Sequence, residues 1–76
     1  MEIIKKYENR KEGNDCLITN YICLIKLDYH LYLLTHTESV YGGWTGNPKT
    51  TQTRIFEDYG DALICMVTLI GKLERE

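Results

Sequence analysis

The fold depends on one stretch near the C-terminus, residues 58–76. The centre of this stretch is Ala62-Leu63-Ile64-Cys65-Met66-Val67-Thr68-Leu69-Ile70. Asp58 is a good N-cap, because its carboxylate can accept hydrogen bonds from the unpaired backbone N–H groups of a first turn. Asp61 extends this signal as a short-armed capping box. Lys72 and Arg75 place positive charge at the other end, as the helix dipole favours. The stretch therefore predicts the only helix, lying as a lid on a small sheet.

The predicted helix is apolar on two opposite sides. At about 100° per residue, one side forms a normal core stripe, which consists of Ala62, Met66, Leu69 and Leu73. Ile64, Val67 and Thr68 point the other way. A helix that is apolar nearly all round is normally buried on both sides. We therefore expect these three residues to form a dimer contact or a second interface, although two apolar residues on a helix surface are also ordinary.

Length and composition indicate one small globular domain that gains from a partner. The chain has 76 residues, of which 43% are hydrophobic, so residues 1–76 are expected to form a single domain rather than a disordered segment. A chain of this size buries little more than about 60% of its unfolded surface and is marginally stable alone. The net charge of -2 and the lack of a basic cluster argue against nucleic acid as the main partner.

Cysteine usage and the N-terminus favour the cytoplasm. The three cysteines, Cys16, Cys23 and Cys65, are odd in number and lack paired spacing, which suits a reducing compartment. The first residues do not follow the basic-then-apolar order of a signal peptide. No apolar run approaches the roughly 18 residues of a membrane span. We expect a cytoplasmic protein that does not bind the membrane.

The first half of the chain predicts strands. Residues 1–7 form a short strand candidate, whereas residues 8–15 are polar or glycine and predict a loop. Residues 17–27 and 30–36 are strand-like runs separated by a short interruption, and they predict a hairpin. The hairpin has apolar residues on both faces, with Ile22 on one side and Ile25 on the other. This lack of a polar face predicts a central hairpin with the helix on one side and something else on the other.

The next segment, residues 37–49, contains three glycines and the only proline, and it predicts irregular structure. Residues 50–56 alternate and predict a last strand before the helix. The expected fold is therefore α+β, a four-stranded antiparallel β-meander packed against one C-terminal α-helix.

The irregular segment holds the residues most suited to binding a partner. Tyr41 and Trp44 offer large contact area, and both residue types are frequent among interface hot spots. We predict a partner-binding site formed by Tyr41, Trp44, Asn47, Lys49 and Arg54. In the alternative interpretation Trp44 folds back as a plug on the sheet edge. A phosphate-binding loop is a weaker reading of the glycines, because no Lys-Ser/Thr pair or helix follows them.

Catalytic and metal-binding patterns are weak. His30 and His36 fall six residues apart on one predicted strand, about 20 Å from each other, so one metal ion cannot bind both. His36, Glu38 and Ser39 are close in sequence, yet adjacent strand positions point apart and no nucleophile-elbow pattern surrounds Ser39. We expect no catalytic residues, no metal and no cofactor.

These patterns favour a non-enzymatic protein-binding module that acts as an inhibitor or regulator. A short, tyrosine-rich chain without catalytic motifs is similar in size and composition to the small inhibitors of phages and other mobile elements, including anti-CRISPR proteins. That similarity involves no motif and identifies no family. One alternative is a small-ligand or nucleotide-binding module in which Tyr41, Trp44 and His36 stack on the ligand, and another is a small hydrolase subunit.

Overall fold

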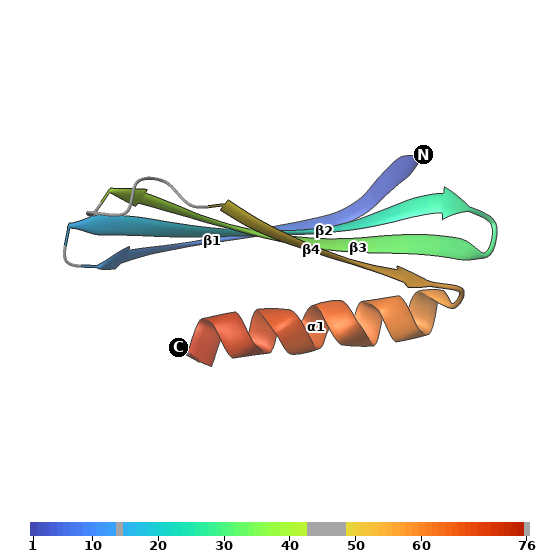
Figure 1. The fold of residues 1–76 in the computed structure, drawn as a ribbon. Helices are drawn as coiled ribbons and strands as arrows, with labels where there is room; N and C mark the ends of the chain where they lie inside the picture. The colour runs from blue at the N-terminus through green and yellow to red at the C-terminus, as the bar shows by residue number, and fades with distance from the viewer. Residues whose placement is uncertain (14, 43–48, 76) are drawn as a thin grey trace.

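A computed structural model of the chain describes residues 1–13, 15–42 and 49–75 (Figure 1). Its elements are β1 (Glu2–Gly13), β2 (Cys16–Asp28), β3 (Leu31–Gly42), β4 (Lys49–Phe56) and α1 (Tyr59–Arg75). The strands form one antiparallel sheet in chain order, and α1 lies along one face of it (Figure 1). The predicted α+β class, with four antiparallel strands and one C-terminal helix, is confirmed.

Strand β1 is longer than the sequence predicts. The loop expected at residues 8–15 was wrong for residues 8–13, which continue β1 and pair with β2 from Glu8↔Tyr21 to Gly13↔Cys16. The polar composition misled because β1 is an edge strand, where charged side chains face solvent and discourage pairing with other chains. A register shift between Ile3 and Lys5 adds a bulge to the same edge.

Strand β3 also extends beyond its predicted end. Residues 37–42, expected to be irregular, continue the strand and pair with β2 from Tyr21↔Thr37 to Cys16↔Gly42. The long partner strand supplies hydrogen bonds that outweigh the local composition. His30 precedes β3 and lies in the turn, so the expectation that it shares a strand with His36 was wrong.

The helix begins as the capping signal predicts. The backbone N–H of Asp61 donates to Asp58 Oδ2 at 3.3 Å, and that of Ala62 donates to the Asp58 carbonyl oxygen at 3.2 Å. The first bond satisfies a donor that has no backbone partner within the helix, and the second is the first i→i−4 bond of the helix. Among the described residues no other helix occurs, and α1 is too short and too polar to span a bilayer.

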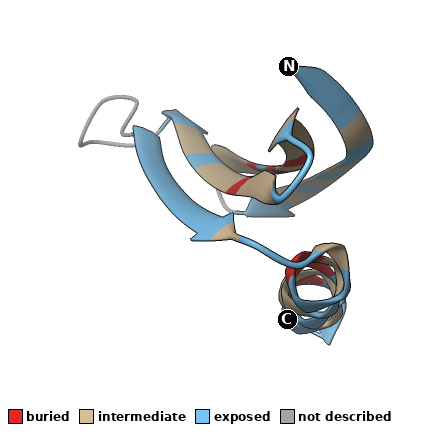
Figure 2. Cartoon of the chain, turned by 90° about the vertical axis from the view of Figure 1, so that its right-hand side faces the viewer, coloured by how far each residue is buried: buried red, intermediate tan, exposed pale blue. Residues whose placement is uncertain are grey.

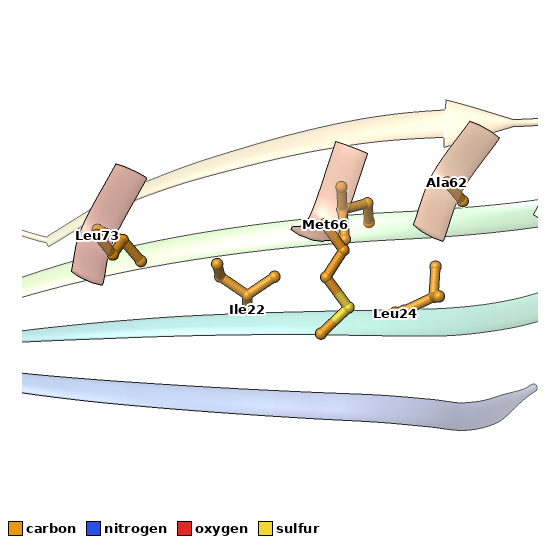
Figure 3. Packing of buried hydrophobic residues seen from close by; sticks show 6 residues of the cluster. Ile22, Leu24, Ala62, Met66 and Leu73 are labelled. Carbon is orange, nitrogen blue, oxygen red and sulfur yellow. The ribbon is translucent and has the colours of Figure 1, made fainter. Parts of the chain in front are cut away.

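The core lies between α1 and the two central strands. Met66 reaches down between Ile22 and Leu24 of β2, with Leu73 toward one end and Ala62 toward the other (Figure 3). Ile22 and Leu24 are completely buried. Leu69 of the predicted core stripe is half-buried and packs against this cluster. The helix therefore uses the face that its sequence predicts.

Hydrogen-bonded polar groups border the core near the end of the helix. The Tyr7 hydroxyl donates to Glu74 Oε1 at 3.3 Å and accepts a hydrogen bond from Asn9 Nδ2 at 3.2 Å. The buried Asn20 places its Oδ1 3.0 Å from His36 Nε2. The Asn20–His36 contact joins β2 to β3, and the Tyr7–Glu74 bond links β1 to α1.

We predict that Met66→Ala lowers the free energy of unfolding by about 2–5 kcal/mol, because it leaves a cavity between Ile22 and Leu24. A domain of this size has roughly 4–11 kcal/mol in total, so a large part of the stability would be lost. Val67→Ala is the matched control on the exposed side of the same helix and should change stability by less than about 0.5 kcal/mol. Urea denaturation at low protein concentration measures both. Equal losses would contradict this packing.

Candidate functional site

The sheet has one covered face and one open face. Side chains alternate along a strand, so Ile22 and Leu24 face α1 whereas their neighbours Tyr21 and Cys23 face the other way. Viewed along the strands, α1 lies on one side of the sheet only (Figure 2). We call the uncovered side the open face, and its main residues are Ile3, Leu17, Thr19, Tyr21, Cys23, Ile25, Leu33, Thr35, Thr37, Ser39, Tyr41, Lys49, Thr51, Thr53 and Ile55.

An apolar row crosses the open face from edge to edge. The register pairs Ile3 with Ile25, Ile25 with Leu33 and Leu33 with Ile55, so one apolar residue from each strand lies side by side. Ile3 is 50% exposed and Ile55 is 64% exposed. Four aligned apolar side chains on an uncovered sheet face form a contiguous patch, the kind of surface feature that marks interaction sites. We call these four residues the apolar row.

Beyond the apolar row, the open face is rich in hydroxyl groups. The next positions along the strands bring Thr35, Thr37, Thr51 and Thr53 into adjacent cross-strand pairs. The hydroxyls of Thr37 and Thr51 lie 3.3 Å apart. Small hydroxyl side chains leave the face shallow and can donate or accept hydrogen bonds.

Two tyrosines lie beyond the apolar row on this face, with Tyr21 opposite Thr37 and Tyr41 opposite Leu17 near the end of the sheet. Tyr21 and Tyr41 line one shallow depression, together with Leu17 and Lys49. Both rings are partly exposed, and both belong to regular strands rather than to a loop. Their positions are therefore fixed by the hydrogen bonds of the sheet.

Glu8 and Arg10 set the charge around Tyr21. Arg10 Nε donates to Glu8 Oε1 at 2.9 Å. The Glu8 carboxylate raises the pKa of the Tyr21 hydroxyl above its ordinary value of 10.0, first by accepting its hydrogen bond and second through its negative charge; the charge of Arg10 acts in the opposite direction.

The structure divides the predicted partner-binding residues between two faces. Tyr41 and Lys49 are brought together on the open face. Arg54 lies on the opposite side of β4, where it pairs with Leu34 and its Nη1 lies 3.9 Å from Cys65 Sγ of the helix. Trp44 and Asn47 fall outside the described residues.

The predicted second interface lies on the outer side of α1. Ile64 is 67% exposed and Val67 is 60% exposed, which agrees with their predicted position opposite the core stripe. Thr68 is exposed next to them, and its hydroxyl donates to the Ile64 carbonyl oxygen at 2.8 Å.

The structure separates His36 from Tyr41 and from Ser39, although the sequence left open that these residues share a ligand or catalytic site. His36 pairs with Ile22 on the helix side, whereas Tyr41 pairs with Leu17 on the open face, so one ligand cannot stack on both rings. Ser39 faces the depression that Tyr41 lines, away from His36. The described residues contain no group of three or more His, Cys, Asp or Glu side chains that could hold a metal ion.

A small pocket lies between α1 and β4. Arg54 and Lys72 line it together with Cys65. Arg54 and Lys72 give the pocket a positive charge, and no acidic residue of the described part of the chain lines it.

Sequence reasoning missed the apolar row. The alternation in β2 indicated that Ile25 faces away from Ile22. It could not show that Ile3 and Ile55, from strands at the two ends of the chain, join the same row.

Comparison with protein-family models, with curated proteins and with solved structures gives no match to this chain.

We predict that Glu8→Gln lowers the pKa of the Tyr21 hydroxyl toward its ordinary value, because the amide has no negative charge to disfavour the phenolate. An NMR titration of the Tyr21 ring between neutral and alkaline pH measures the change. Glu12→Gln, farther along the same strand, is the control and should leave this pKa unchanged. An unaltered pKa in Glu8→Gln would mean that the two side chains do not interact in solution.

Proposed function

We propose that the chain is a non-enzymatic module that binds a partner protein on the open face and acts in the cytoplasm as a small inhibitor or regulator. The observation behind this proposal is the apolar row, which spans a sheet face that α1 does not cover. Each square ångström of apolar surface that a partner removes from water contributes about 25 cal/mol. The exposed ends of the row, Ile3 and Ile55, would contribute most to this free energy, because they have the most apolar surface left to bury.

The residues around the row suit a protein partner. Tyrosine is enriched among the residues that dominate binding energy, and Tyr21 and Tyr41 flank the hydroxyl-rich part of the face. Charged side chains, which are depleted in interface cores, lie mainly toward the edge strands at Lys6, Glu8, Arg10 and Lys49. The centre is thus apolar or neutral, with a charged rim.

The open face is also built on strands rather than on loops. Strand pairing fixes the backbone beneath each contact residue, so little conformational freedom remains to be lost on binding. A rigid, shallow surface is suited to a partner of complementary shape. The proposed action is therefore occlusion: the module covers a surface that the partner needs for its own activity.

We also propose that the chain forms a homodimer through the outer side of α1, at Ile64, Val67 and Thr68. The support is the exposure of two large apolar side chains in the middle of the helix. Such a contact is separate from the open face, because the two lie on opposite sides of the molecule (Figure 2).

We predict that Tyr41→Ala and Ile55→Ala each weaken partner binding by about 2 kcal/mol, or roughly thirtyfold in Kd. The partner is first captured from a lysate of the source organism with the immobilised chain and then purified for calorimetric titration. Gln52→Ala is the matched control, since Gln52 lies on the same strand as Ile55 but on the helix side.

The melting temperature of each variant separates binding from folding. Well-folded open-face variants with unchanged affinity would overturn this proposal. Loss of affinity in Gln52→Ala alone would move the site to the helix side. The regulatory role requires a further result, which is that the partner's activity falls as the complex forms.

A further inference from the structure

We infer that two copies pair through antiparallel α1 helices, back to back, and that the dimer presents its two open faces in opposite directions. The inference rests on the proposed homodimer and specifies its geometry. It begins with the order of residues along the outer side of α1, where Gly60, Ile64, Val67 and Gly71 follow one another at spacings of four, three and four residues. We call these four residues the outer stripe.

The outer stripe has the same order of residue types in both directions: glycine, large apolar residue, large apolar residue, glycine. In an antiparallel pair with two-fold symmetry, each contact occurs twice and the residue numbers of opposed positions have a constant sum. If Ile64 opposes Val67 of the second copy, Gly60 opposes Gly71 of the second copy in the same register. Each apolar side chain then meets another apolar side chain, and each glycine meets a glycine. A parallel two-fold pair would also set glycine against glycine and apolar side chain against apolar side chain, so the charges beside the stripe decide the direction.

The charges beside the outer stripe support the antiparallel direction. Asp61, Thr68 and Lys72 lie along one flank of the stripe at helical spacing. In the antiparallel pair, Asp61 of one copy lies near Lys72 of the other. The two positions are offset by two residues, or about 3 Å along the helix axis. Neither residue has an ion-pair partner within the described residues. Two such intermolecular pairs would form in each dimer, because the symmetry repeats them.

Contacts within the single chain do not explain why residue 71 is a glycine. Glycine inside a helix is unfavourable relative to alanine. A Cβ atom at Gly71 would meet nothing closer than the Arg75 guanidinium at 3.7 Å, an ordinary contact, so packing within the chain does not require glycine. Close approach of a second helix would require it. Gly60 has its own explanation, because a Cβ there would crowd the Asp58 carboxylate at 3.2 Å.

The consequence for function comes from the layer order. The helix lies on one side of the sheet and the open face is on the other (Figures 1 and 2). Helix-to-helix pairing therefore gives the order sheet, helix, helix, sheet, with both open faces outermost. Such a dimer is bivalent, and it can bind two partner molecules at once or two sites of one oligomeric partner. Bivalent attachment raises overall affinity without new contacts.

A charge-exchange experiment tests this geometry. Sedimentation equilibrium from micromolar to millimolar concentration should show a dimer for the unmodified chain. Asp61→Lys and Lys72→Asp should each weaken dimerisation by at least about tenfold in Kd, because each opposes like charges across the axis. The chain with both substitutions should recover the dimer. Both sites are exposed, and melting temperatures verify that every variant folds.

Two further variants separate the dimer contact from other effects. Gly71→Ala should weaken the dimer yet raise the melting temperature of the monomer, since alanine favours the helix but separates the two backbones. Ile55→Glu, on the open face, should leave dimerisation unchanged. Dimers that persist in both single charge variants, or that Ile55→Glu abolishes, would overturn the back-to-back geometry while the homodimer itself stands. A monomer at every concentration would overturn the homodimer.

Discussion

The packing of one helix on a four-stranded sheet is the constraint on which the rest of this structure depends. Met66 and its neighbours in α1 bury Ile22 and Leu24, and this contact supplies most of the core. A helix of 17 residues is about 26 Å long, whereas a strand of 12 residues extends about 40 Å. One such helix can cover only part of one face. No element among residues 1–13, 15–42 and 49–75 covers the other face.

That exposed face differs from the solvent side of an ordinary antiparallel sheet. Sheets of this kind usually alternate apolar residues toward the core with polar residues toward water. Here β2 and β3 contribute apolar residues to both faces, and Ile3 and Ile55 extend the outer set to the sheet edges. Keeping such residues in contact with water costs free energy that a polar residue would not. A partner that covers the apolar row offsets this cost, which is why the proposed function is assigned to the open face.

The two proposed contacts use opposite sides of the molecule and therefore do not compete. The open face offers a broad, shallow surface with tyrosines and hydroxyl groups. The outer stripe of α1 offers a narrow line of two apolar residues and two glycines with charges of both signs beside it. Broad and aromatic surfaces suit a partner of different shape, whereas a palindromic line suits a second copy of the same helix. The proposed functions of the two sides follow from this difference.

The sequence alone determined the elements whose signals are local. The Asp58 cap, the apolar stripe of Met66 and the exposed position of Ile64 follow from helical periodicity within a few residues. The class of fold followed from the order of these elements. Local signals were misleading at residues 8–13 and 37–42, because composition favoured loops while β2 supplied a long partner strand for both segments.

Only the tertiary structure decided which residues share a surface. The side that a strand residue faces depends on strand pairing, and a shift of one residue reverses it. Lys49 was expected in an irregular segment, so nothing in the sequence showed that it faces away from Arg54, five residues later in β4. The apolar row needed the register of all four strands at once. Periodicity determines which residues within one element are neighbours, whereas hydrogen bonds between elements determine which distant residues meet.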